Sequence, residues 1–104
     1  MRRAARKDAN HREIIRAFES MGASVIDVSD TPCGFDILCG HGGLCIAIEI
    51  KDGSKPPSAR RLTANEKRVH ERWTGGMRIV ESVEDAIATV CLLRKWHAAI
   101  CRST

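Results

Sequence analysis

The spacing of hydrophobic residues changes several times along the chain, and each change predicts a new element of secondary structure. From Asn10 to Met21 these residues recur every three or four positions, which is typical of an amphipathic helix that Asn10 caps. Gly22 follows as a C-terminal stop. Residues 23–28 are rich in β-branched side chains and run into a turn-forming sequence, so we expect a strand there.

Two further apolar segments, residues 35–39 and 44–51, flank a glycine-rich stretch and predict a β-hairpin. If the turn comprises residues 40–43, Cys39 pairs with Leu44. An even number of turn residues is assumed here, because an odd number would move every side chain to the other face of the sheet.

This register brings acidic side chains together. Asp36 lies opposite Ala47, and Glu49 and Lys51 share the strand face of Ala47 because side chains alternate between faces. We therefore expect Asp36 and Glu49 to be diagonal neighbours across the hairpin, close enough for their carboxylates to meet.

The second half of the chain predicts two helices and one more strand. The prolines and glycine of residues 52–58 favour a loop, and Thr63 with Glu66 forms a capping box. We expect a helix from Thr63 to about Trp73, a strand over 77–81, and a last helix that starts at Ser82 and continues through Trp96, with Ile87, Val90, Leu93 and Ile100 on one apolar stripe.

Length and composition favour one α/β domain. The chain has 104 residues, of which 43% are hydrophobic and 29% charged, as expected for a globular protein with one core. The predicted order is α, β, β, β, α, β, α, which implies a small mixed sheet of about four strands flanked by helices. We assign residues 1–9 to a basic flexible arm and residues 10–104 to the domain.

Charge is distributed unevenly along the chain. Residues 17–50 contain five carboxylates and no lysine or arginine, whereas the segments 1–16 and 51–68 each contain six basic residues against two acidic ones. An acidic centre between basic segments suggests a cation site within a surface that attracts polyanions. An ordinary solvated charged surface is the alternative.

The sequence gives no sign of a membrane segment. No apolar run approaches the roughly 20 residues needed to cross a bilayer, and no hydrophobic signal core follows the basic N-terminus. Five cysteines form an odd set without a secreted disulfide framework. We therefore expect a cytoplasmic protein with no membrane partner.

The acidic hairpin suggests metal-assisted chemistry. Two adjacent carboxylates repel each other unless a cation lies between them, and Mg²⁺ typically takes one or two protein carboxylates and keeps several waters. Lys51 could orient or activate water while the ion stabilises charge on a phosphate. Alternatively, Glu49 and Lys51 are an exposed charge pair and Asp36 is a turn residue.

These residues resemble the signature of a known nuclease superfamily. Gly34-Phe35-Asp36, followed thirteen positions later by Glu49-Ile50-Lys51, is similar to the active-site motif of the PD-(D/E)XK nucleases, and most similar to the small phage-type VRR-NUC and Holliday junction resolvase-like enzymes. The likeness covers about residues 8–90. One departure is Phe35, which stands where the motif usually has proline.

The resemblance implies a restriction-endonuclease-like core and a divalent-metal-dependent DNA endonuclease of a bacterium or phage-infected cell. It implies that Asp36 and Glu49 bind Mg²⁺ or Mn²⁺, with the Ile50 carbonyl as a third ligand and Lys51 as the catalytic lysine. Glu13 is a further candidate ligand, although a glutamate in a first helical turn also stabilises the helix dipole. Glu66 is explained by the capping box alone.

DNA contacts are expected around the loop that follows the catalytic strand. The candidates are Lys55, Ser58, Arg60 and Arg61, with Arg6 and Lys7 adding sequence-independent attraction. Because the chain has no tyrosine and only four aromatic residues, we expect contacts to duplex or branched backbone rather than base stacking.

A homodimer is expected, because symmetric cleavage of both strands of a junction requires two sites. Trp96 and Ile100, near the end of the last helix, are candidates for its interface. Two alternatives to a nuclease remain: a catalytically inactive DNA-binding module that retains the fold, and a structural subunit whose acidic hairpin faces a protein partner.

Overall fold

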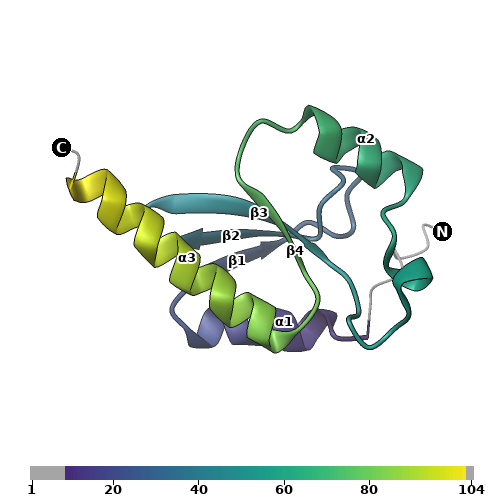
Figure 1. The fold of residues 1–104 in the computed structure, drawn as a ribbon, viewed down its shortest axis with the longest axis horizontal. Coiled ribbons are helices and arrows are strands. Elements are labelled where there is room, and N and C mark those ends of the chain that lie inside the picture. Colours follow the sequence, from purple (N-terminus) through teal and green to yellow (C-terminus); the bar gives the residue numbers. More distant parts are fainter. Residues whose placement is uncertain (1–8, 103–104) are drawn as a thin grey trace.

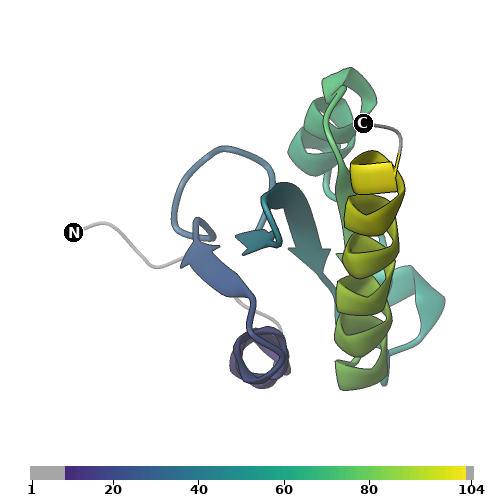
Figure 2. The same cartoon turned by 90° about the vertical axis from the view of Figure 1, so that its left-hand side faces the viewer.

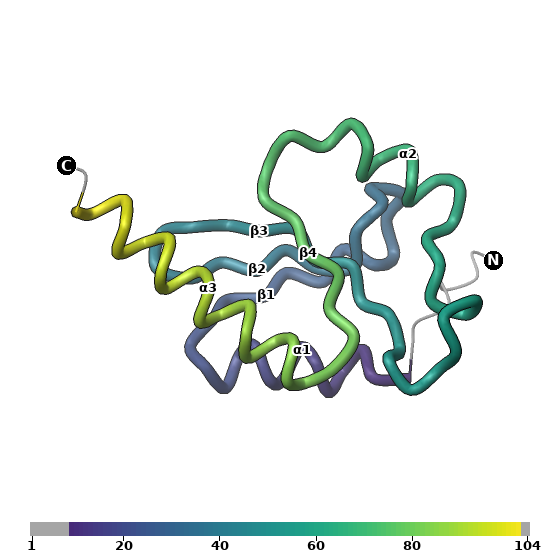
Figure 3. The backbone as a smooth tube through the Cα atoms, viewed as in Figure 1, coloured from purple at the N-terminus to yellow at the C-terminus, as the bar shows by residue number. Residues whose placement is uncertain are grey.

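The secondary structure follows the order expected from the sequence. The computed structural model describes residues 9–102 and is shown as a ribbon in Figure 1 and as a backbone tube in Figure 3. Its elements are α1 (His11–Ser20), β1 (Ser24–Asp27), β2 (Ile37–His41), β3 (Leu44–Ile50), the 3₁₀ turn η1 (Pro57–Arg60), α2 (Ala64–Arg72), β4 (Met77–Val80) and α3 (Val83–Arg102). The predicted α/β class and the order αβββαβα are confirmed; the 3₁₀ turn lies within and just beyond the expected loop.

The four strands form one mixed sheet in the order β1-β2-β3-β4. The first three strands are antiparallel neighbours, whereas β4 runs parallel to β3. A parallel pair cannot be joined by a tight turn, so the chain leaves the end of β3, forms η1 and α2, and returns to start β4 beside β3. This crossover brings the start of α2 near the end of β3.

The core lies on one face of the sheet. Ile46, Ile48 and Ile50 alternate along β3 and are at most 1% exposed. α1 and α3 cover this face, while α2 stands on the other side of the sheet (Figures 1 and 2). The buried apolar cluster also includes Ile14 and Phe18 from α1, Ile37 and Cys39 from β2, Val80 from β4, and Ala86, Val90 and Leu93 from α3.

The hairpin is tighter than predicted, and the predicted register is wrong by two residues. Gly42 and Gly43 have φ values of 58° and 82°, as required at the two central positions of a type I′ turn. β2 therefore continues to His41, and Cys39 pairs with Ile46 rather than Leu44. An even shift preserves the faces, so Asp36 stays on the side of Glu49.

The buried stripe of α3 also differs from the expectation. Val90 and Leu93 of the predicted stripe are buried, whereas Ile87 on the same stripe is 42% exposed, and Ile100, expected beyond the core, is 51% exposed. Ile87 is turned about 100° from the buried Ala86 around the helix axis, and α3 extends beyond the sheet before it reaches Ile100 (Figure 1). The sequence pattern could not show where the sheet ends beneath the helix.

The predicted basic arm lies almost entirely outside the described residues. Of the predicted basic arm, residues 1–9, only Ala9 falls within the described part of the chain. Within residues 9–102, none of the helices has the length and apolar character needed to span a membrane.

Candidate active site

Asp36 and Glu49 face each other across the β2–β3 hairpin. The paired register of the hairpin ends at the pair Ile37–Ile48, one residue after Asp36, and the Asp36 and Glu49 side chains line the same pocket at that end of the hairpin. The Asp36 N–H donates to the Ile48 carbonyl (2.9 Å), and Asp36 Oδ2 accepts from the Ile50 N–H (2.8 Å). Both bonds fix the Asp36 carboxylate against β3.

The two carboxylates line one small pocket of about 150 Å³. Its walls come from the β1–β2 loop, the end of β3 and the start of α2. The lining residues are Ser29, Thr31, Gly34, Phe35, Asp36, Glu49, Thr63, Asn65 and Glu66. Ser29, Thr31 and Asn65 were not predicted, because they lie in loops or in a helix cap and only the tertiary fold brings them to the hairpin.

Glu49 is a buried acid beside a second acid. It is 2% exposed, and burial, the charge of Asp36 and hydrogen bonding with Glu66 together raise the pKa of Glu49 to about 10. A carboxylate resists ionisation when it leaves water and faces a like charge. The pair therefore holds a proton at neutral pH unless a cation takes its place.

Lys51 lies one side-chain step beyond Glu49 and contacts two carboxylates. Its Nζ donates to Glu66 Oε1 at 3.0 Å and lies 3.4 Å from Glu49 Oε2. Burial alone would lower the pKa of Lys51, but the hydrogen bond to Glu66 and the charges of Glu49 and Glu66 outweigh it and raise that pKa above its usual value. Lys51 is therefore an ammonium group at neutral pH, a hydrogen-bond donor and not a base.

Glu66 has two roles, of which the sequence showed one. The expected capping box is present: Glu66 Oε1 accepts from the Thr63 N–H (2.8 Å), and Thr63 Oγ1 accepts from the Glu66 N–H (3.1 Å). The same Oε1 also accepts from Lys51. Burial opposes ionisation, but these donors hold the pKa of Glu66 below its usual value. The cap of α2 thus positions the lysine of β3.

The Ile50 carbonyl is oriented toward the same place. In an extended strand the N–H and C=O of one residue point to the same side. Since the Ile50 N–H donates to Asp36, the Ile50 carbonyl also faces the Asp36 side of β3. The predicted third ligand is therefore on the correct side of the strand.

The donor set fits a hard divalent ion that keeps most of its waters. In the described part of the chain, no group of three or more His, Cys, Asp or Glu side chains is arranged to hold a metal ion. Two carboxylates and a carbonyl are nevertheless the oxygen donors that Mg²⁺ takes from proteins, and an ion would replace the proton held by this pair.

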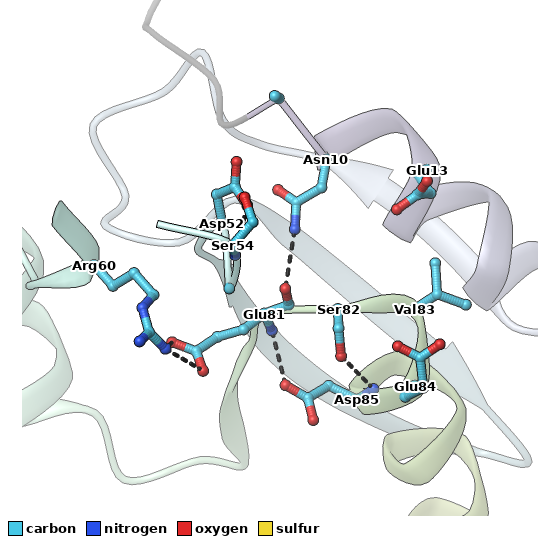
Figure 4. A pocket seen from close by; sticks show the side chains of 12 residues that line it. Asn10, Glu13, Asp52, Ser54, Arg60, Glu81, Ser82, Val83, Glu84 and Asp85 are labelled. Atoms are coloured by element: carbon cyan, nitrogen blue, oxygen red, sulfur yellow. Dashed lines mark hydrogen bonds and ion pairs between the residues drawn. The ribbon is translucent and has the colours of Figure 1, made fainter. Parts of the chain in front are cut away.

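A larger cleft of about 920 Å³ lies between the start of α1, the segment after β3 and the start of α3 (Figure 4). Within residues 9–102, five carboxylates line it, from Glu13, Asp52, Glu81, Glu84 and Asp85. The cleft also contains Arg60, whose guanidinium donates to both oxygens of Glu81 at 3.1 and 3.2 Å. Its size alone would make it the first candidate for a site, but its charge repels phosphate.

The structure separates Glu13 from the other candidate ligands. Glu13 lies in the first turn of α1 and lines the larger cleft, whereas Asp36 and Glu49 line the smaller pocket. Asn10 occupies the N-cap position but makes no capping bond; its side-chain amide donates instead to the carbonyls of Lys51 and Glu81, both at 3.2 Å. Asn10 thereby fastens α1 to the ends of β3 and β4.

The predicted DNA contacts have different environments. Lys55, Ser58 and Arg61 are exposed on the segment after β3. Arg60 is partly buried in its ion pair with Glu81, on the larger cleft. Arg6 and Lys7 lie outside the described residues.

Comparison with known proteins places the chain in no family. Neither a family model, nor a curated protein, nor a solved structure matches it. The resemblance to the PD-(D/E)XK nucleases therefore depends on the site residues themselves.

Proposed function

We propose that this protein is a DNA endonuclease that requires Mg²⁺ or Mn²⁺ and hydrolyses phosphodiester bonds at the Asp36–Glu49 pocket. The observation that carries the proposal is that the Asp36 and Glu49 carboxylates line one pocket at the end of the hairpin, with the Lys51 ammonium 3.4 Å from Glu49. A buried pair of this kind is unfavourable without a cation, so stability alone does not explain it. Binding a hard ion and a phosphate would explain it.

Each residue has a distinct role in this proposal. Asp36, Glu49 and the Ile50 carbonyl would hold the ion, which when bound polarises the phosphate and supplies an acidified water. Lys51 donates hydrogen bonds to a phosphate oxygen and neutralises the charge that develops on it. Glu66 and Glu49 fix the direction of the Lys51 side chain.

A nucleic acid is the substrate class that suits the surroundings of the pocket. The start of α2 lines the pocket, and the same helix presents Lys67, Arg68 and Arg72 to solvent. Exposed guanidinium and ammonium groups beside the site attract a phosphate backbone without regard to sequence. The resemblance to resolvase-like enzymes favours branched DNA within this class.

Two copies of the chain would act together on a branched substrate. We propose a homodimer in which the C-terminal end of α3 packs against a second copy, since Trp96 and Ile100 there are 42% and 51% exposed. The variant Ile100→Arg should shift the mass measured by light scattering from two chains to one. If the unmodified protein already has the mass of one chain, the dimer proposal is contradicted.

The experiment that tests the proposed function is a cleavage panel. End-labelled flap, four-way junction, nicked and blunt duplex DNAs are incubated with protein in Mg²⁺, in Mn²⁺ and in EDTA, and Lys51→Met serves as the matched variant. We expect cutting in either metal, none in EDTA, and a large loss with Lys51→Met. Salt-dependent binding without metal-dependent cutting would indicate an inactive DNA-binding module, and no salt-dependent binding would indicate a structural subunit.

A further inference from the structure

Two of the four aromatic residues gather beside the pocket, together with a histidine. The Phe35 and His70 rings are stacked, with centroids 4.7 Å apart and an angle of 14° between their planes. The Trp73 indole meets Phe35 edge to face at 5.3 Å. His70 also donates from Nε2 to the Gly34 carbonyl at 3.1 Å, which joins α2 to the turn before Asp36. The cluster therefore connects the far end of α2 to the site.

Trp73 is held in one place, although much of it is in water. Its Nε1 donates to the Gly76 carbonyl at 3.0 Å, and Gly75 packs so closely on the indole that an added Cβ would lie 2.9 Å from a ring carbon. Despite these contacts Trp73 is 44% exposed. A tryptophan in the core would be covered, and a tryptophan on a mobile loop would not be fixed at three points. A rigid, exposed aromatic surface is instead suited to stacking.

The distance between Trp73 and the pocket corresponds to a few nucleotides of a DNA strand. Phe35, which Trp73 touches, lines the pocket and directly precedes Asp36. Along α2, Trp73 lies seven residues beyond Glu66, a rise of about 10 Å, which is about three base steps of a DNA strand. Arg68 and Arg72 are exposed on the same helix and could contact the phosphates between the two points.

We propose that Trp73 stacks on an unpaired nucleobase a few nucleotides from the phosphate that Lys51 contacts. This inference rests on the proposed function and adds its substrate preference: DNA with a single-stranded segment next to the cut, such as a flap or an opened branch. A paired base is already stacked on both faces within a duplex, so only an unpaired base gains from the indole. The low aromatic content predicted the opposite, but the fold concentrates the few aromatics at the site.

The first test uses Trp73 itself as the probe. In the Trp96→Phe protein, Trp73 is the only tryptophan. Oligothymidine of about twelve nucleotides is titrated in EDTA, so that no cutting occurs, and a blunt duplex of equal length is titrated in parallel. We expect saturable quenching of the indole emission by oligothymidine and little by the duplex. Binding of oligothymidine, measured by anisotropy, without any quenching would overturn the proposal.

The second test compares the two tryptophans. Trp73→Leu should weaken the binding of a flap by roughly five- to 150-fold more than it weakens the binding of blunt duplex. Both variants are made in the Ile100→Arg background, which removes the proposed dimer; Trp96→Leu is then the matched control, since Trp96 is 42% exposed on α3, and it should change both affinities by the same factor. Trp73→Phe should retain most of the flap preference if the ring stacks. Equal losses on flap and duplex for Trp73→Leu would contradict stacking.

The two proposals can fail separately. If Lys51→Met abolishes metal-dependent cutting but oligothymidine does not quench Trp73, the nuclease proposal stands and the stacking proposal fails. Quenching and flap preference in EDTA without cutting in Mg²⁺ would retain the stacking site on an inactive DNA-binding module.

Discussion

The small Asp36–Glu49 pocket and the larger cleft are both lined by acidic residues, but they differ in how those residues are buried and paired. Asp36, Glu49 and Glu66 line the smaller pocket; Asp36 accepts from the Ile50 N–H, and the Lys51 ammonium contacts both glutamates. The larger cleft is about six times as voluminous, and five carboxylates line it beside a single guanidinium that is already paired. Among the described residues, these carboxylates repel phosphate, and the Arg60 guanidinium is engaged by Glu81.

The difference shows that burial and pairing identify a site better than volume does. Glu49 is almost fully buried beside Asp36, which is tolerated only if a cation or a proton compensates. Carboxylates that line an open cleft can remain in water at little free-energy cost. The comparison therefore predicts that variants at the small pocket change activity, and that variants at the large cleft change at most the stability.

The largest expected effect is the loss of cleavage in Asp36→Asn. Removing one ligand charge should lower the rate of metal-dependent cutting by roughly 10³-fold, since an ion that polarises a phosphate contributes several kcal/mol to the transition state. The matched variant in the large cleft is Glu84→Gln, which should stay within about twofold of the unmodified protein. Equal losses for the two variants, measured on the same labelled DNA, would break the comparison. Glu13→Gln should behave like Glu84→Gln.

Gly34→Ala should disrupt the small pocket through packing. Gly34 has φ +92°, and an added Cβ would lie 2.7 Å from Val69. Backbone strain and overpacking together should lower the free energy of unfolding by about 3 kcal/mol. Gly43→Ala is the control, because Gly43 has φ +82° with open space around it, and it should lose only about 1 kcal/mol.

Chemical denaturation measures both glycine variants. If Gly34→Ala is no worse than Gly43→Ala, contact between α2 and the turn before Asp36 is not what builds the pocket.

Mg²⁺ should stabilise the protein more as the pH rises. The folded pKa of Glu49, about 10, exceeds its usual value of 4.5, so the stability that the retained proton contributes is present below pH 4.5 and is lost as pH rises toward 10. An ion replaces that proton, and at a hundredfold excess over Kd it adds about 2.7 kcal/mol. Thermal melts with and without Mg²⁺ at about pH 8 and about pH 5.5 should show the larger shift at the higher pH. A shift that is equal at both pH values, or that persists in Glu49→Gln, would argue against an ion at Glu49.

Glu66→Gln should reduce the cleavage rate by about tenfold, which is typical when a group that orients a site residue is removed. The glutamine oxygen can still accept from Thr63, so the cap and the fold should survive. Its effect should nearly vanish in a Lys51→Met background, because Glu66 acts through Lys51. Additive effects in the double variant would show that Glu66 acts independently of the lysine.

The smallest effect is expected in the large cleft. Arg60→Met removes the ion pair with Glu81, in which the two side chains are 25% and 33% exposed, and should change stability by roughly 0.5 kcal/mol. The cleavage rate at saturating DNA should remain unchanged. A large loss of rate would give the cleft a part in the reaction.

Most of the fold followed from local pattern, whereas the site required tertiary information. Helical spacing, the Thr63 capping box and the β-branched segments predicted every helix and strand, because these signals are local. The strand period placed Asp36, Glu49 and Lys51 on one face, although the register was displaced by two residues because a type I′ turn at Gly42 and Gly43 was not recognised.

The remaining features depend on how distant segments meet. Glu66 reaches Lys51 only because the crossover returns α2 to the end of β3, and Glu13 faces away from the site because of the direction in which α1 crosses the sheet. Neither follows from residue spacing. The cluster of Trp73 with Phe35 joins residues 38 positions apart in the chain, which explains why counting aromatics could not predict it.

The most direct test of the central claim is calorimetric titration of Mn²⁺ into the metal-free protein, with Asp36→Asn and Glu84→Gln measured alongside. The Asp36–Glu49 pocket predicts one site per chain that is lost in Asp36→Asn and unchanged in Glu84→Gln. Binding that survives in Asp36→Asn, or that disappears in Glu84→Gln, would place the ion in the larger cleft and contradict the assignment.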